Sequence, residues 1–194
     1  MSYFAKFEKI NGQLFRFDTR IYLTEFDPQE PSICVGAIVG KNPGSAQPHI
    51  FGELQPLDLN GDKMLPAVRN RFLDAYKIAK KNIPINAYVR VWNLFYLCDP
   101  DLSSACNKIA NFSNIPICES EKDYTPIIWF GWGGSDNRLN TYKNRFISKT
   151  WDNQFYYSHS EKRVVNQLPC PESFAKHTQG MPSEPVNGHL SEII

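Results

Sequence analysis

Short apolar runs alternate along this chain with longer segments in which apolar residues recur at helical spacing. The runs at 33–39 (ICVGAIV) and 126–130 (PIIWF) are almost continuously apolar, a pattern typical of strands buried on both faces of a parallel sheet. With two further runs they give four expected strands: 33–39, 87–97, 126–130 and 154–158. The amphipathic segments give the expected helices: 65–81, 102–112 and one that Ser135 or Asp136 caps and that continues to about Ser148.

The N-terminal segment predicts an antiparallel hairpin. Asn11 and Gly12 stand between FEKI and QLFRF, and this dipeptide is a strong signal for a two-residue type I′ turn. A second extended piece, RIYLTEF, follows. The segment 44–63 predicts a long loop, and the segment after Lys162 holds one more apolar piece.

Strands that alternate with helices indicate an α/β fold. We expect a three-layer sandwich with a central, mostly parallel four-stranded sheet plus an N-terminal β-hairpin, in a single domain over residues 1–194. In such sheets ligands bind beyond the carboxyl ends of the strands. Three polar or glycine-rich segments stand at the ends of expected strands: 40–44 (GKNPG), the surroundings of Asn93 and 131–134 (GWGG). The sequence therefore predicts a binding site at this edge of the sheet.

Composition narrows the classes of partner and cofactor. The net charge is +1 and no basic arm is present, which argues against extensive nucleic-acid coating but allows contact with a few phosphates. Five cysteines without a C-x-x-C pair argue against a disulfide scaffold, a zinc ribbon and an iron–sulfur cluster, so no metal and no cofactor is expected. The N-terminus lacks a secretory core, and no apolar run is long enough to cross a bilayer. We expect a cytoplasmic monomer without membrane contact.

The pentapeptide 40–44 carries the strongest candidate chemistry. Gly40 and Gly44 allow backbone conformations that other residues resist, and Pro43 stiffens the turn. Asn42 is thereby held at a strand end, where its side chain offers one hydrogen-bond acceptor and two donors. It can orient a water molecule, but it is a poor proton acceptor. The alternative is a structural turn in which Asn42 bonds only to its own backbone.

The segment GKNPGSA, which begins at Gly40, resembles the G-x-N-P-G motif of the mismatch-specific uracil and thymine-DNA glycosylases, a branch of the uracil-DNA glycosylase superfamily. That family's second motif is a Met-Pro-Ser loop near the C-terminus, and the segment 180–185 (GMPSEP) matches it in the same order. The chain also resembles an uncharacterised group of small bacterial and phage proteins in the segments RFDTRIYL, KNPGSA, WNLF and GWG. This second resemblance concerns architecture and brings no assigned activity.

The first resemblance implies that the protein is a monofunctional glycosylase that hydrolyses an N-glycosidic bond in DNA. A single target nucleotide leaves the duplex to enter the pocket, and the transition state is oxocarbenium-like. The resemblance gives Asn42 the role of placing water beneath the sugar C1′, while N–H groups of the turn stabilise the departing base. An intercalation loop would fill the gap left by the flipped base, and its residues are Met181, Pro182, Ser183, Glu184 and Pro185.

Other candidates depart from the family pattern or stand beside it. The chain has no His-Pro motif, and His177 is the catalytic candidate that reaches the leaving base, with His189 as the alternative. Phe51 is the candidate that stacks on the base. For each of these side chains, packing or an exposed position without a role is the alternative. The predicted substrate-binding residues are Gly40, Lys41, Pro43, Gly44, Ser45, His49, Phe51, Asn93 and Trp132.

The identity of the base stays open. Uracil or a mismatched thymine is one option. A hydroxymethylated or glucosylated pyrimidine of a phage genome is another, because the long 44–63 loop can open the pocket for a bulky base. That option would place the protein in phage defence rather than in DNA repair. Two other classes also remain: a hydrolase or transferase of free nucleosides or nucleotides, and a base-binding module that has lost catalysis.

Overall fold

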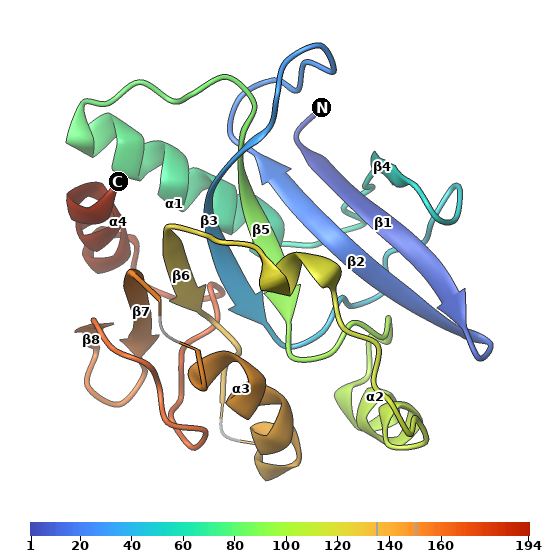
Figure 1. Ribbon diagram of the computed structural model, residues 1–194. Helices are drawn as coiled ribbons and strands as arrows, with labels where there is room; N and C mark the ends of the chain where they lie inside the picture. The colour runs from blue at the N-terminus through green and yellow to red at the C-terminus, as the bar shows by residue number, and fades with distance from the viewer. Residues whose placement is uncertain (135, 150) are drawn as a thin grey trace.

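One mixed sheet of eight strands forms the frame of residues 1–134, 136–149 and 151–194, which the computed structural model describes (Figure 1). The strand order across the sheet is β4-β1-β2-β5-β3-β6-β7-β8. The strands are β1 (Tyr3–Ile10), β2 (Gln13–Tyr22), β3 (Ile33–Gly40), β4 (Leu54–Pro56), β5 (Ala87–Asn93), β6 (Ile127–Phe130), β7 (Asn153–Ser158) and β8 (Arg163–Val165). The helices are α1 (Met64–Ala79), α2 (Leu102–Ile109), α3 (Asn140–Ile147), α4 (Ser183–Ile193) and the short 3-10 helices η1 (Glu119–Lys122) and η2 (Asn137–Leu139).

The expected α/β class is confirmed, but the expected four-stranded sheet is wrong. β5, β3, β6 and β7 pair in parallel, yet they are only the middle and one side of a larger mixed sheet. The N-terminal hairpin is not an addition to that sheet, because β2 runs on and pairs antiparallel with β5 from Thr19 to Tyr22. The three-residue strands β4 and β8 then extend the two edges by pairing with β1 and β7. Strands this short show no periodic pattern in the sequence.

Helices cover both faces of the sheet. α1 and α4 lie side by side on one face, and α2 and α3 cover the other (Figure 1). Alternate residues of β3 point to the two faces, so that Ile38 packs with α1 and α4 whereas Ala37 and Val39 pack with α2 and α3. Two hydrophobic clusters, one on each face, therefore hold the carboxyl ends of the parallel strands in fixed positions.

Several local predictions can be compared with the structure. The hairpin turn is confirmed, since Asn11 and Gly12 have φ angles of 48° and 75°, as a type I′ turn requires. Asp136 caps η2, which leads into α3, by accepting a hydrogen bond from the Arg138 N–H at 3.0 Å. Ser135, the other capping candidate, lies outside the described residues.

The C-terminal segment differs from its prediction. The expected loop over Met181–Pro185 is wrong from Ser183 onward, because Ser183, Glu184 and Pro185 form the first turn of α4. Proline is tolerated in a first helical turn, where no N–H of its own is needed. Val186 and Leu190 then pack against the sheet on the same side as α1.

Candidate functional site

The loops after β3 and β5 are tied together at the carboxyl edge of the sheet. The Leu94 N–H donates to the Gly40 carbonyl at 3.0 Å, and the Phe95 N–H donates to the Lys41 carbonyl at 3.3 Å. A Cβ on Gly40 would lie 3.1 Å from Asn93 Oδ1, so a side chain at this position would push the two loops apart. The turn that carries Asn42 is therefore held in place by its neighbouring strand.

A cavity of about 350 Å³ lies beside this turn. Its walls come from the turn itself (Asn42, Pro43 and Gly44), from the segment 61–64 before and at the start of α1, and from Arg16, His177 and Gln179. A second cavity of about 220 Å³ shares part of these walls and extends to Ser45. The first cavity is within the usual size range of small-ligand pockets, and in α/β proteins such pockets lie at the carboxyl edge of the parallel strands.

Asn42 is oriented by one hydrogen bond. Its Nδ2 donates to the backbone carbonyl of Asp99 at 2.8 Å. Asp99 is itself held, because its Oδ2 accepts from Ser104 Oγ and from Lys108 Nζ, each at 2.7 Å. This bond fixes the amide plane of Asn42, and its Oδ1 then has the capacity to accept a hydrogen bond from a water molecule in the cavity.

His177 lines the same cavity from the C-terminal part of the chain. Its Nδ1 accepts a hydrogen bond from the Gln179 N–H at 3.3 Å, so the neutral ring carries its proton on Nε2. Burial is the main cause that lowers the pKa of His177, the Lys41 charge lowers it further, and Asp62 partly opposes both. At neutral pH the side chain is therefore an uncharged imidazole with an Nε2–H donor.

The lowered pKa of His177 predicts a dependence of stability on pH. Below the ordinary histidine value of 6.5, the unfolded chain takes up a proton at this position more readily than the folded protein does, so acidification costs stability. The His177→Gln variant lacks this cost. Relative to the wild type, its free energy of unfolding should therefore improve as the pH falls from 7.5 to 5.5. Urea denaturation at the two pH values measures this, and parallel losses in both proteins would contradict the prediction.

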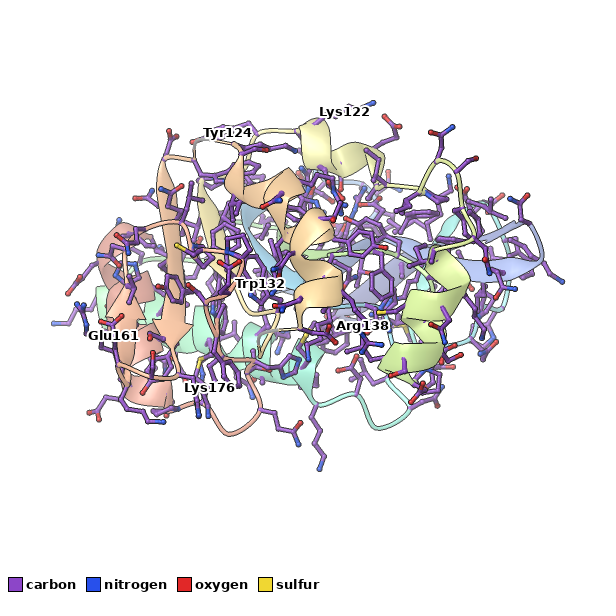
Figure 2. All side chains as sticks on the ribbon, turned by 90° about the horizontal axis from the view of Figure 1, so that it is seen from below. Lys122, Tyr124, Trp132, Arg138, Glu161 and Lys176 are labelled. Carbon is purple, nitrogen blue, oxygen red and sulfur yellow. The ribbon has the colours of Figure 1, made fainter. Side chains whose placement is uncertain are left out.

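Two predicted residues at the sheet edge are buried away from the cavity. Asn93 lies behind Gly40 and is 1% exposed. Trp132 is fully buried among the side chains beneath α3, where its Nε1 donates to the Ser173 carbonyl at 3.4 Å and Lys143 Nζ stands 5.8 Å from its ring (Figure 2). Lys41 is half-buried and packs against Gly133. These side chains support the turn from behind.

The other predicted residues also lie outside the cavity. His49 and Phe51 are exposed on the loop before β4, where His49 Nε2 bonds with Asp58 Oδ2 at 3.0 Å. Met181 is buried in the cluster with α1 and α4, and its carbonyl accepts from Arg71 at 3.3 Å. The exposed side chains of the expected intercalation loop are Pro182, Ser183, Glu184 and Pro185. Five of the predicted site residues therefore line one or both of the two cavities: Asn42, Pro43, Gly44, Ser45 and His177.

Three charged residues of the cavity were not among the site residues predicted from the sequence: Arg16, Asp62 and Lys63. Asp62 also stabilises the start of α1, since its Oδ1 accepts from the N–H groups of Met64 at 2.7 Å and Leu65 at 3.2 Å. An Asp before an amphipathic run is a recognisable helix-start signal. Arg16 stands between two buried phenylalanines of β2, and an Arg inside an apolar strand pattern is the sequence signal that could have identified it.

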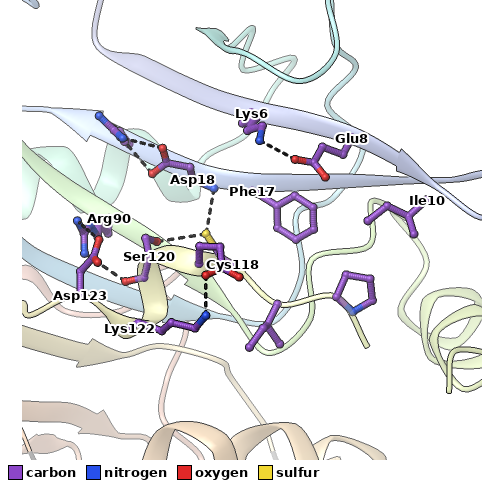
Figure 3. Close-up of a pocket in the computed structure, with 14 residues that line it drawn as sticks. Lys6, Glu8, Ile10, Phe17, Asp18, Arg90, Cys118, Ser120, Lys122 and Asp123 are labelled. Atoms are coloured by element: carbon purple, nitrogen blue, oxygen red, sulfur yellow. Dashed lines mark hydrogen bonds and ion pairs between the residues drawn. The ribbon is translucent and has the colours of Figure 1, made fainter. Parts of the chain in front are cut away.

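A larger cavity, of about 580 Å³, lies between the β1–β2 hairpin and η1 (Figure 3). Its charges neutralise one another: Lys6 pairs with Glu8, Arg20 with Asp18, Arg90 with Asp123 and Lys122 with Glu119, at 2.6 to 2.8 Å. Burial raises the pKa of the Cys118 thiol in its wall, which makes this thiol a poor nucleophile. No predicted site residue lies in this cavity, and we regard it as a structural groove.

Three further findings concern metal ions, membranes and known proteins. Among the described residues, no group of three or more His, Cys, Asp or Glu side chains is placed to hold a metal ion. No helix within the described part of the chain is long and apolar enough to span a membrane. In comparisons with protein-family models, with curated proteins and with solved structures, no significant match to this chain was found.

Proposed function

We propose that this protein is a monofunctional glycosylase that hydrolyses the N-glycosidic bond of a pyrimidine nucleotide in DNA. One observation carries the proposal: Asn42 and His177, far apart in the sequence, line the same cavity at the carboxyl edge of the sheet. Asn42 offers an oriented hydrogen-bond acceptor, and His177 offers a neutral donor. Hydrolysis requires a positioned water on one side of the breaking bond and a stabilised leaving group on the other, which are the roles that this pair is suited to.

The two residues have complementary roles in the proposed reaction. Asn42 Oδ1 accepts a hydrogen bond from a water molecule and aims its oxygen at C1′. As the C1′–N bond breaks, the sugar becomes oxocarbenium-like and the base departs with the bonding electron pair. The Nε2–H of His177 donates to the base and stabilises this negative charge. The new C1′–O bond forms, and the water releases its proton to solvent. Because Asn42 orients the water without deprotonating it, the reaction should favour bases that leave readily.

The form of the substrate is the second part of the proposal. The exposed Pro182–Pro185 turn at the start of α4 is the available segment for a contact with duplex DNA, since Met181 is buried. That burial favours a second candidate, a hydrolase of free nucleotides, which needs no wedge. Uracil, mismatched thymine and the modified pyrimidines of phage genomes remain the candidate bases, and an action on the last of these would place the protein in phage defence.

Base release from a panel of substrates tests the proposal. The panel contains labelled duplexes and single strands with uracil, G·T, hydroxymethyluracil, hydroxymethylcytosine and its glucosylated form, together with the corresponding free nucleotides. We expect one base to be released from DNA, leaving an abasic site that alkali cleaves. Release only from monomers would replace the DNA glycosylase by the nucleotide hydrolase. If no member reacts in either form, glycosidic hydrolysis is contradicted and a base-binding module takes its place.

A further inference from the structure

Arg16 of β2 is a buried cation for which the described residues supply no paired carboxylate. It is 3% exposed, and its Nε has no hydrogen-bond partner among the described residues. The guanidinium forms no ion pair within the described chain either. A buried cation without a partner is costly, and buried polar groups are otherwise almost always satisfied. The position of this charge therefore requires an explanation other than stability.

Arg16 lines both cavities, which also share walls at Pro43, Gly44, Gly61 and Asp62. Two turns line the second cavity with it: Pro43–Ser45 and Asn60–Gly61. Gly44, Asn60 and Gly61 have positive φ angles of 54°, 44° and 84°. Within the described structure, the N–H groups of Gly44, Ser45 and Gly61 have no backbone partner. Unpaired amides on turns of this kind form concave sites that attract anions.

The local charge favours an anion as well. Arg16 and Lys63 are cationic, and Asp62 is the carboxylate that opposes them. The Oδ1 of Asp62 is occupied by the first N–H groups of α1. This helix of 16 residues begins at Met64, in the wall of the cavity, so the positive end of its dipole lies at the same place.

We propose that Arg16 and the turns 43–45 and 60–61 form a binding site for a phosphate group. The guanidinium offers a planar fork of donors that matches phosphate oxygens, and the turn amides supply further donors. The site adjoins Asn42 and His177, so a nucleotide placed there would have its phosphate on Arg16; this nucleotide part of the inference rests on the proposed function. Phosphate binding itself does not depend on any cleavage. The phosphate belongs either to a free nucleotide or to a DNA strand.

Thermal unfolding in a chloride buffer titrated with inorganic phosphate tests the site. We expect a saturable rise of the melting temperature for the wild type. In Arg16→Met the apparent affinity should fall by at least about tenfold, because charge-assisted hydrogen bonds are lost. Its melting temperature without phosphate should be unchanged or higher, because the substitution removes an unpaired buried charge. A purely structural arginine would instead lower the melting temperature in both conditions.

The matched control is Arg20→Met, which removes the same charge from the same strand but at a side chain paired with Asp18 at 2.7 Å. It should keep the response to phosphate. Arg16→Lys retains the charge without the fork and should bind phosphate more weakly than the wild type. It replaces the methionine variant if that variant does not fold. A wild type that phosphate does not stabilise, or an equal response in Arg16→Met, overturns the proposal.

Three further ligands distinguish the source of the phosphate. Deoxyuridine, deoxyuridine 5′-monophosphate and a single-stranded oligonucleotide without terminal phosphates are compared by calorimetry. A free nucleotide as ligand predicts that the monophosphate binds at least tenfold more tightly than the nucleoside, with the difference lost in Arg16→Met. A DNA strand predicts that the oligonucleotide binds most tightly and loses affinity in the same variant. Phosphate binding without base release from any substrate would contradict the proposed function but support the phosphate site.

Discussion

Replacement of Asn42 by alanine should lower the rate of base release by about 100-fold, because misplacement of a reacting group by about 1 Å can cost about 10²-fold in rate. The variant loses Oδ1, the proposed acceptor for the water, together with the bond from Nδ2 to the Asp99 carbonyl. Asp99 is only 6% exposed, so its carbonyl loses a buried hydrogen bond when the Asn42 side chain is removed. The cost in stability should therefore be about 1–3 kcal/mol. Single-turnover base release and urea denaturation of the same preparations measure the two effects.

Asn153→Ala is the matched control for this prediction. The Nδ2 of Asn153 also donates to a backbone carbonyl, that of Pro126 at 3.2 Å, but it does so at the first residue of β7, on the opposite edge of the sheet. Its removal should cost a similar amount of stability and leave the rate of base release unchanged. If Asn42→Ala releases the base as fast as the wild type, Asn42 has no part in the reaction. If both variants lose the same activity, the effect of Asn42 is one of stability.

The parallel strands could be predicted because their own residues encode them. The runs at 33–39 and 126–130 are apolar enough to be buried on both faces, whatever lies beside them. The docking of β2 on β5 has no such local signal, since it depends on a register between Thr19 and Val91 that the folded chain sets. α4 was missed for a related reason. Its buried stripe consists of Val186, Asn187 and Leu190, and its first turn contains a proline, so the helical period is weak.

The candidate site could be predicted only in part. Asn42 could be predicted because it stands in a Gly- and Pro-containing turn after a buried strand, whereas Arg16 enters the site from the hairpin that was expected as an addition to the sheet. Trp132 follows a strand end, where turns are usually exposed. Here the segment that includes Ser173 and Ala175 covers that turn, and Ala175 accepts a hydrogen bond from the Gly133 N–H at 2.7 Å. Burial by a distant segment is a property of the whole fold, and no window of the sequence contains it.

Replacement of Glu121 by alanine should lower the free energy of unfolding by about 3–5 kcal/mol, because it leaves the largely buried Arg145 guanidinium without its carboxylate. The Glu121 side chain is 2% exposed and bonds with Arg145 Nε at 2.8 Å. The Tyr96 hydroxyl donates to its Oε1 at 2.6 Å. Such a loss is a large part of the 5–15 kcal/mol that typically stabilises a domain. Denaturation in guanidinium chloride measures it.

Two comparisons show whether the effect of Glu121→Ala belongs to the buried pair. Glu119 stands in the same 3-10 helix, but its side chain is 83% exposed in a pair with Lys122, so Glu119→Ala should cost less than about 1 kcal/mol. In the double variant Glu121→Leu with Arg145→Met both charges are gone, and part of the stability should return.

That double variant still lacks three hydrogen bonds. The Tyr96 hydroxyl loses its acceptor. The carbonyls of Asn93 and Leu94 lose the bonds from Arg145 at 3.0 Å and 3.1 Å, where β5 is tied to the turn before Asn42. A stable protein with slower base release would then show that the buried pair positions the site as well as stabilising the fold, whereas equal costs for Glu119→Ala and Glu121→Ala would contradict any special role of this pair.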